Sequence, residues 1–209
     1  MLASIKKEDK IGISRISFLN HVRLWVNTFD ELGIDGLKCI KKGRPVKVDV
    51  LFKNDDVIFS YRVAGILIHN DKVLLQRPEN DDYAIIGGHV SLLETSVETL
   101  KREYQEELHT KIEVDNLMAI GEIFFPWGKR KCHQICLYYK IHLVNEDIPL
   151  DGMFHGFDQL DNERIDLDYC WVPLQQLKAG IKVYPLEIMP IILDNKEEIV
   201  HFVSREDEI

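Results

Sequence analysis

The sequence contains no long hydrophobic run of the kind that carries a chain into or across a membrane. Its first ten residues, MLASIKKEDK, become charged at Lys6, so they lack the uninterrupted apolar core of a secretory signal. Apolar runs such as Val63 to Ile68 are far shorter than the roughly 20 residues that cross a bilayer. Low-complexity and repetitive segments are also missing. We therefore expect a globular, soluble, cytoplasmic protein with no membrane partner.

Cysteine is scarce, and the four residues Cys39, Cys132, Cys136 and Cys170 form no CxxC pair. In a chain without a secretory signal, cysteines spaced in this way are typically small buried apolar residues. Cys132, His133 and Cys136 fall within a strand-like stretch, in which alternation sends His133 to the face opposite the two thiols. The spacing therefore argues against both a disulfide framework and a zinc site.

Positive charge is in short supply, and its distribution is uneven. The formal net charge is −9. Residues 1–49 hold 10 Lys and Arg against 6 Asp and Glu, a balance of +4, whereas residues 50–209 hold 16 against 29, a balance of −13. A strongly acidic body repels a polyanion, which argues against long nucleic acid as its substrate. A small phosphate compound that arrives with a divalent metal ion is compatible with this charge.

The composition that is present, 45% hydrophobic and 29% charged, is that of an ordinary globular protein. Near the start, apolar residues at spacings of three and four predict an amphipathic helix that ends at Gly33; they are Phe18, Val22, Trp25, Phe29 and Leu32. Turn glycines and Pro45 then predict a linker over residues 36–46. We therefore divide the chain into a helical N-terminal extension, residues 1–45, and a main domain, residues 46–209.

The main domain shows many strand patterns and few helical ones, which predicts an α+β fold. Alternation and apolar runs predict strands over residues 46–52, 57–68, 72–76, 112–125, 131–144, 169–172 and 199–203. A turn is expected at Asn70-Asp71. Helical spacing predicts helices over residues 95–108 and 185–194, with a short turn-helix after Pro173. The acidic stretch from Asn145 to Asp168 is long enough to predict a functional loop.

The helix expected over residues 95–108 carries a dense group of acids. Glu103, Glu106 and Glu107 are related by three and four residues, so they project from one side of the helix. Each like-charged pair costs roughly 0.2–0.5 kcal/mol, which suggests a bound cation that offsets the repulsion. Hard oxygen ligands favour Mg²⁺ or Mn²⁺. The apolar stripe that would pack this helix on the core consists of Val97, Leu100, Tyr104 and Leu108.

Six residues of this region stand at the spacing of a known motif; they are Gly88, Glu94, Arg102, Glu103, Glu106 and Glu107. Residues 88–110 resemble the Nudix box, G-x5-E-x7-R-E-U-x-E-E-x-G-U with U a bulky apolar residue, and match all six G, E, R and paired E positions. The strands before the box, and Trp171 to Leu174 after it, are also similar to Nudix domains. The resemblance implies an α/β/α sandwich around a mixed sheet. It also implies metal-dependent hydrolysis of the pyrophosphate bond in a nucleoside diphosphate linked to a group X.

The resemblance further implies roles for individual residues. Glu103, Glu106 and Glu107 would bind the metal ion together with a backbone carbonyl of Gly87 or Gly88, while Glu94 and Arg102 would pair and hold loop to helix. Bound metal neutralises pyrophosphate oxygens and lowers the pKa of the attacking water. The proton would go to Glu103 or to another acid. The other acids that we consider are Glu122, Asp161, Glu163, Asp166 and Asp168.

The chain also departs from the usual Nudix pattern. His109-Thr110 replaces the closing Gly-U pair, which removes a glycine that would end the helix in a left-handed conformation. Leu93 precedes Glu94 where relatives often have glycine, and Ile85-Ile86 precede Gly87 where they often have Leu-Pro. No proposed ligand is lost. An error of about 1 Å in position can nevertheless cost a hundredfold in rate, so reduced activity is an alternative.

The segment EIFFPWGKRK offers groups that suit a small nucleotide-like substrate. Phe124, Phe125 and Trp127 would stack on a base, and Lys129 and Arg130 would contact phosphate. The competing interpretation is that these aromatic residues belong to the core. The motif does not identify the group X.

The N-terminal extension has a loose likeness of its own. Ile13-Ser14-Arg15, Trp25-Val26, Gly33 to Leu37 and Gly43-Arg44-Pro45 are similar to the end of helix-turn-helix domains in insertion-sequence transposases. This gives an alternative function, a nucleotide-sensing transcriptional regulator with a non-catalytic Nudix domain and an N-terminal DNA contact. The competing interpretation is a helix that packs on the main domain or across a homodimer. Burying each of its large apolar side chains would contribute roughly 1.5–3 kcal/mol.

Overall fold

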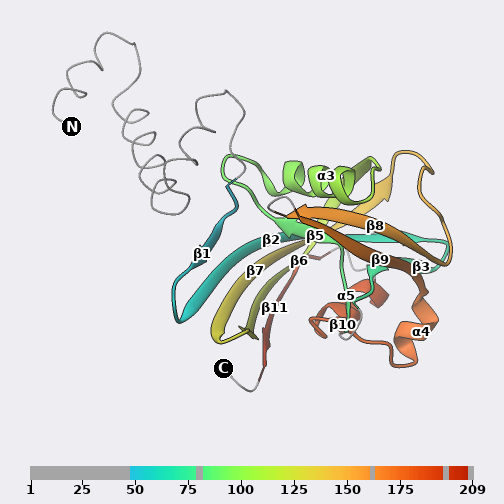
Figure 1. The fold of residues 1–209 in the computed structure, drawn as a ribbon. Coiled ribbons are helices and arrows are strands. Elements are labelled where there is room, and N and C mark those ends of the chain that lie inside the picture. The colour runs from blue at the N-terminus through green and yellow to red at the C-terminus, as the bar shows by residue number, and fades with distance from the viewer. Residues whose placement is uncertain (1–47, 79–81, 161–162, 195–197, 207–209) are drawn as a thin grey trace, which may run out of the picture. The chain divides into compact units, whose positions relative to one another are not determined.

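The structure is a computed structural model that describes residues 48–78, 82–160, 163–194 and 198–206, with backbone only for 158–160 and 163–165 (Figure 1). The helix and the helix-turn-helix likeness expected within residues 1–45 lie outside the described residues. Within the described part of the chain, no helix is long and apolar enough to cross a membrane.

Strands make up most of the described chain. They are β1 (Leu51–Lys53), β2 (Val57–His69), β3 (Lys72–Gln76), β4 (Tyr83–Ala84), β5 (Gly87–His89), β6 (Ile112–Trp127), β7 (Arg130–Leu143), β8 (Met153–Leu160), β9 (Glu163–Pro173), β10 (Val183–Tyr184) and β11 (Val200–Arg205). The helices described are α3 (Ser96–Glu107), α4 (Leu174–Lys178) and α5 (Ile188–Asp194).

The strands form one mixed sheet in the order β10-β4-β3-β2-β7-β6-β11, with β1 and β5 paired to β2, and β8 and β9 to each other. β2 runs parallel to β7 but antiparallel to β3 and β5. Helix α3 covers one face of this sheet, and α4 and α5 lie on the other (Figure 1). The α+β class and the mixed-sheet α/β/α sandwich are therefore confirmed.

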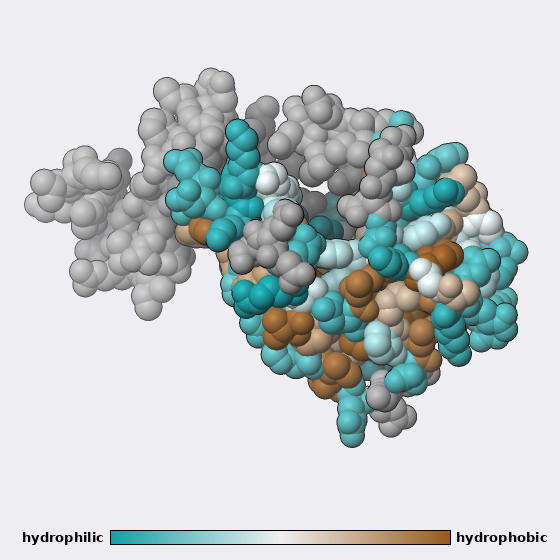
Figure 2. All heavy atoms as spheres, turned by 90° about the horizontal axis from the view of Figure 1, so that it is seen from below, coloured by the Kyte–Doolittle hydropathy of each residue, from teal (hydrophilic) through white to brown (hydrophobic). Residues whose placement is uncertain are grey.

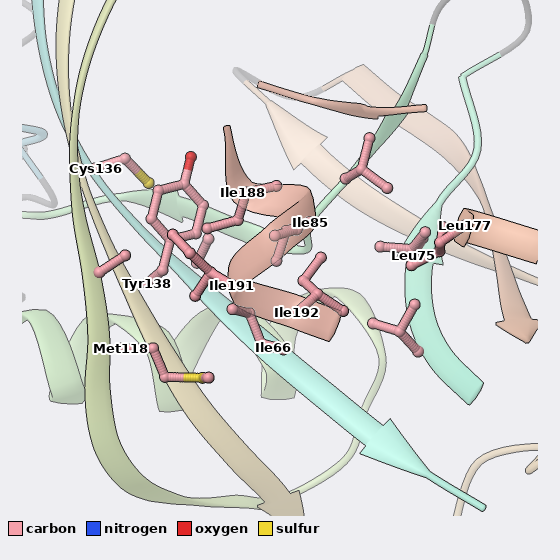
Figure 3. Close-up of a cluster of buried hydrophobic side chains, with 14 of the residues drawn as sticks. Ile66, Leu75, Ile85, Met118, Cys136, Tyr138, Leu177, Ile188, Ile191 and Ile192 are labelled. Carbon is pink, nitrogen blue, oxygen red and sulfur yellow. The ribbon is translucent and has the colours of Figure 1, made fainter. Parts of the chain in front are cut away.

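Strand β2 is buried on both faces because helices cover the sheet on each side. Val63 and Leu67 pack with Leu100 and Tyr104 of α3 in one buried cluster. Ala64 and Ile66 belong to a second cluster, in which Ile188, Ile191 and Ile192 of α5 face the sheet (Figure 3). A strand covered on both faces reads as a continuous apolar run, as VAGILI does. Over the described lower surface, hydrophilic and hydrophobic residues are intermixed (Figure 2).

The turn between β2 and β3 is formed by the Asn-Asp dipeptide at residues 70–71. Asn70 and Asp71 both have positive φ, 48° and 58°. Two consecutive left-handed residues are what a two-residue hairpin turn of the type I′ class requires, and Asn and Asp tolerate that conformation best after glycine. The turn predicted at this dipeptide is confirmed.

The functional loop predicted over residues 145–168 is wrong. Strands β8 and β9 form an antiparallel hairpin there, paired from Met153↔Cys170 to Leu160↔Glu163. The strand predicted over residues 169–172 is the end of β9, which begins already at Glu163. Tyr169 and Trp171 are buried in the core, while Asp166 and Asp168 alternate with them, so the same alternation extends into the acidic stretch. The strand predicted over residues 46–52 was too long in the described part, because β1 begins only at Leu51 and Asp49 makes an isolated bridge to Ser91.

Candidate functional site

Helix α3 begins with a complete capping box. The Thr95 hydroxyl accepts a hydrogen bond from the Glu98 backbone N–H at 3.2 Å, and the Glu98 carboxylate accepts one from the Thr95 N–H at 2.7 Å. These hydrogen bonds satisfy two backbone donors that helix geometry leaves without partners, which fixes where the helix starts. The Thr95 N–H contact, followed by a hydrogen bond that the Thr95 hydroxyl donates to the Glu98 carboxylate at 2.8 Å, lowers the pKa of Glu98. The register of every following glutamate is thereby set.

The expected apolar stripe packs α3 against β2. Leu100 and Tyr104 are fully buried, Leu108 is buried, and Val97 is half-buried. The Tyr104 hydroxyl donates to the Gly65 carbonyl at 3.0 Å. Burial, with a further contribution from Glu107, keeps the pKa of Tyr104 well above its ordinary value, so the hydroxyl remains a donor. This contact locks the helix to the central strand.

Arg102 is the centre of the charged network. Its Nε donates to both oxygens of Glu94, at 3.2 and 3.1 Å, so the pair expected from the sequence is present. Its Nη1 donates to Glu103 at 2.7 Å and to Glu106 at 2.8 Å, and its Nη2 to the Ser91 hydroxyl at 3.3 Å. The Arg102 guanidinium therefore links the loop before α3 to two carboxylates of that helix.

The charge of Arg102 is maintained by these neighbours. Burial by itself would lower the pKa of Arg102, but the adjacent carboxylates, Glu103 foremost and then Glu106 and Glu94, raise it overall. The side chain is 19% exposed, so solvent screens these contacts less than it screens a surface ion pair. Arg102 thus acts as a permanent cation in the network.

The loop end of the network is braced by two further hydroxyl groups. Thr99 donates to Glu94 at 2.8 Å, and Ser91 donates to Asp49 at 3.1 Å. Asp49 and Ser91 also form a backbone bridge. The segment before β1 is therefore connected to the same guanidinium through Ser91.

Glu103 lies directly over the Cα of Gly88. A Cβ at Gly88 would stand 2.2 Å from the Glu103 carboxyl carbon, a distance that atoms do not reach. Gly87 is equally restricted, because a Cβ there would stand 2.0 Å from the Val63 carbonyl oxygen. The Gly87 carbonyl accepts a hydrogen bond from Arg62 at 2.8 Å. The paired glycines therefore let β5 approach both the helix carboxylate and β2.

Glu107 points to a different partner from Glu103 and Glu106. The hydroxyl of Tyr169, a fully buried residue of β9, donates to Glu107 at 2.8 Å. Gly156 of β8 leaves room for this arrangement, since a Cβ there would stand 2.7 Å from the Tyr169 ring. The β8–β9 hairpin therefore positions the last glutamate of α3.

The residues fit a divalent cation in their chemistry. Glu103 and Glu106 both accept from Nη1 of Arg102, so one positive group already lies between them. Strand β5 approaches Glu103 closely at Gly88. Carboxylate and carbonyl oxygens are the donors that Mg²⁺ prefers. Within the described ranges no three His, Cys, Asp or Glu residues are arranged as a metal-binding group. The Glu107 carboxylate is oriented by the Tyr169 hydroxyl.

Leu93 and His109 stand where the motif usually has glycine, and both adopt a backbone conformation that glycine favours. His109 has φ 54° and Leu93 has φ 70°, which is the left-handed region that glycine favours. Leu93 is fully exposed, and the His109 ring packs on Phe157 at 5.1 Å between centroids. Thr110 is buried and hydrogen-bonds to Asp147. The loop geometry is therefore retained at a cost in backbone strain.

The residues expected to bind substrate fall into two pockets. Phe125 lines the first, of about 480 Å³, with Arg62, Gln134, Tyr184 and Glu206; we name it the Phe125 pocket. Trp127, Lys129 and Arg130 instead line a second pocket of about 590 Å³ with Lys53, which we name the Lys53 pocket. Phe124 instead stacks on His133, with ring centroids 4.4 Å apart.

The other acids considered as bases lie in varied settings. Glu122 pairs with His201 at 2.9 Å, and Asp168 contacts His155 at 2.5 Å. Asp166 is exposed on β9. Asp161 and the side chain of Glu163 lie outside the described residues. Cys132 and Cys136 are buried free thiols whose pKa burial raises to about 11, as expected of apolar core residues.

Three residues of the network were missed in the sequence. Ser91 and Tyr169 carry no motif signal, because each meets its partner only through the fold. Arg62 could have been found, since it is a lone cation in an otherwise apolar strand pattern that the core should exclude.

Comparisons with known proteins identify the domain in which these residues lie. Residues 60–190, more than half of the chain, match the family model of the NUDIX domain. Similar solved structures include a NUDIX hydrolase from Nitrosomonas europaea, at 16% identity over 70% of this chain and 79% of that one, with a TM-score of 0.49. An ADP-ribose pyrophosphatase from Streptococcus suis is 13% identical over 70% and 98%, with a TM-score of 0.43. The mutator MutT protein from Bacillus halodurans is 19% identical over 71% and 91%, with a TM-score of 0.47.

These TM-scores lie below 0.5, so no argument about substrate rests on the three structures. A search of the curated proteins gives no match. The family model is sufficient, because it spans the box and the strands on both sides of it. The chain therefore belongs to the Nudix family, as a Nudix pyrophosphohydrolase.

Proposed function

We propose that this protein hydrolyses the pyrophosphate bond of a nucleoside diphosphate linked to a group X, with Mg²⁺ or Mn²⁺ held by α3. The products would be a nucleoside monophosphate and a phosphorylated X. The observation that carries the proposal is the Arg102 network, which gathers Glu94, Glu103 and Glu106 beside Gly88 within the NUDIX domain.

Each group of the network has a task in this chemistry. Glu103, Glu106 and Glu107, with a carbonyl of Gly87 or Gly88, would hold the divalent ion that Nudix hydrolases generally use. When bound, that ion neutralises the pyrophosphate oxygens and lowers the pKa of water. Glu94 and Arg102 fix the loop, and Glu103 would accept the proton of the attacking water.

The Phe125 pocket is suited to the nucleoside. Its volume of about 480 Å³ is that of a small-molecule site, and Phe125 provides a ring for stacking beside the polar groups of Arg62, Gln134 and Tyr184. Burial, followed by the neighbouring Glu206, raises the pKa of Tyr184, so its hydroxyl stays protonated as a donor. Arg62 also contacts the Gly87 carbonyl, which connects this pocket to β5 beside the network.

The proposal is tested by a screen for magnesium-dependent hydrolysis with product identification. The substrates are ADP-ribose, nucleotide sugars, dinucleoside polyphosphates and nucleoside triphosphates. We expect cleavage within the pyrophosphate of at least one diphosphate-linked compound. Tight nucleotide binding without turnover would contradict the proposal and would favour the regulator.

A further inference from the structure

The Lys53 pocket is a hollow that the proposed nucleoside site does not use. It crosses four adjacent strands in the order β1, β2, β7 and β6. Its apolar floor includes Leu51 and Ile58, and its volume is about 590 Å³. Lys53 comes from β1, while Lys129 comes from the turn between β6 and β7 and Arg130 from the start of β7. Cations thus reach this pocket from two opposite walls.

The charge of the pocket is opposite to that of the domain around it. Its lining holds three cations against one acid, Asp55, whereas residues 50–209 carry a balance of −13. Lys and Arg side chains that converge on a hollow from separate strands match a phosphate, whose oxygens accept several charged hydrogen bonds at once. The Lys53 pocket therefore has the chemistry of an anion site.

Stacked rings connect this pocket to the proposed active site. The Trp127 ring lies parallel to that of Phe125, with centroids 6.2 Å apart and 22° between planes. It is also stacked with His89, at 6.3 Å and 19°. Phe125 lines the nucleoside pocket, and His89 follows Gly88 in β5. Trp127 is 42% exposed and lines the Lys53 pocket, so a flat group can stack on it.

We propose that the Lys53 pocket is a second anion subsite that selects dinucleotides bearing an additional phosphate monoester. This rests on the proposed function, in which the pyrophosphate lies beside Gly88 and one nucleoside occupies the Phe125 pocket. The group X then extends past His89 onto Trp127, and its phosphate meets Lys53, Lys129 and Arg130. The substrate class is thus a phosphorylated dinucleotide rather than a simple nucleotide sugar.

The test compares two probes that differ by one phosphate, NADPH and NADH, titrated calorimetrically into the full chain in EDTA. In a body of charge −13 an added phosphate should weaken binding unless a dedicated site receives it. We expect NADPH to bind at least about tenfold more tightly than NADH. The variant Lys53→Ala/Lys129→Ala/Arg130→Ala should lose this preference.

A matched control removes the same number of charges from exposed positions elsewhere, as Lys111→Ala/Lys178→Ala/Lys182→Ala. The control should keep the preference for NADPH. Equal or undetectable binding of both probes, or a preference that survives in the Lys53 variant, would overturn the inference. Hydrolysis with Mg²⁺ is measured separately: a preference for NADPH without any turnover would leave the subsite standing and refute the proposed function.

Discussion

Leu93 and His109 occupy backbone conformations in which any residue with a Cβ is strained. A left-handed conformation costs a non-glycine residue roughly 1–2 kcal/mol, and neither side chain gains deep burial in return, because both are exposed. The sequence shows both departures from the motif. It does not show that the chain would keep the left-handed geometry, because that depends on the packing of α3 and the Arg102 network around it.

Replacing Leu93 by glycine should therefore stabilise the protein. The free energy of unfolding should rise by about 0.5–1 kcal/mol, because the relief of backbone strain in the folded state outweighs the greater conformational entropy of glycine in the unfolded chain. Urea denaturation measures it. Leu92→Gly is the control, because Leu92 is also exposed but does not have positive φ. If Leu93→Gly is no more stable than wild type, the left-handed backbone at Leu93 does not strain the protein.

Tyr169 should act as a positioning residue for Glu107. Tyr169→Phe removes the 2.8 Å hydrogen bond to this buried carboxylate and should cost about 1–2 kcal/mol of stability. Because partners of metal ligands tune affinity, we expect Mg²⁺ to bind roughly 10–100-fold more weakly, measured by calorimetry. Tyr139→Phe, which removes the hydroxyl contact to Ser96 at 2.8 Å, should leave Mg²⁺ affinity unchanged. If both variants lose Mg²⁺ affinity to the same extent, the effect of Tyr169→Phe is purely structural.

At the scale of elements, Arg102 joins α3 to the loop before it. Arg102→Ala leaves buried Glu103 without its guanidinium partner, so the protein should lose about 3 kcal/mol of stability, with a lower Tm. Lys101→Ala is the matched control on the same helix. Lys101 pairs with Glu113 in an exposed contact, which is worth only about 0.2–1 kcal/mol. Equal Tm values for Arg102→Ala and wild type would refute the structural role of the network.

Most elements could be predicted because their periodicity is local. The α3 stripe, the β2 and β7 strands and the Asn70-Asp71 turn all follow from spacing within a few residues. The strand over residues 169–172 was predicted, but β8 and the first part of β9 were missed because the acidic composition of residues 145–168 was interpreted as a loop. The contacts of Tyr169 with Glu107 and of Arg62 with Gly87 join residues 62 and 25 positions apart, so no local pattern predicts them.

At the scale of the whole molecule, the described members of the Arg102 network lie between Asp49 and Tyr169. We therefore predict that deletion of residues 1–45 retains magnesium-dependent turnover within about threefold, since the electrostatic groups of the reaction remain. Kinetics, solution mass and duplex DNA binding at two salt concentrations measure the effect.

The same deletion distinguishes the two interpretations of the N-terminal extension. A role in packing or dimerisation predicts a changed melting temperature or mass. Salt-sensitive DNA binding by the full chain, lost on deletion while melting and mass stay the same, would instead favour the regulator.

We propose above that the α3 carboxylates hold the metal ion that makes pyrophosphate hydrolysis possible. The most direct measurement is the magnesium dependence of turnover, on the best substrate of the screen, for wild type, Glu106→Gln and Glu98→Gln. Glu98 lies on the same helix and glutamine preserves its capping role. We predict that Glu106→Gln lowers turnover at least about a hundredfold with folding intact, while Glu98→Gln does not. Wild-type turnover in Glu106→Gln, or turnover that needs no metal, would contradict the account.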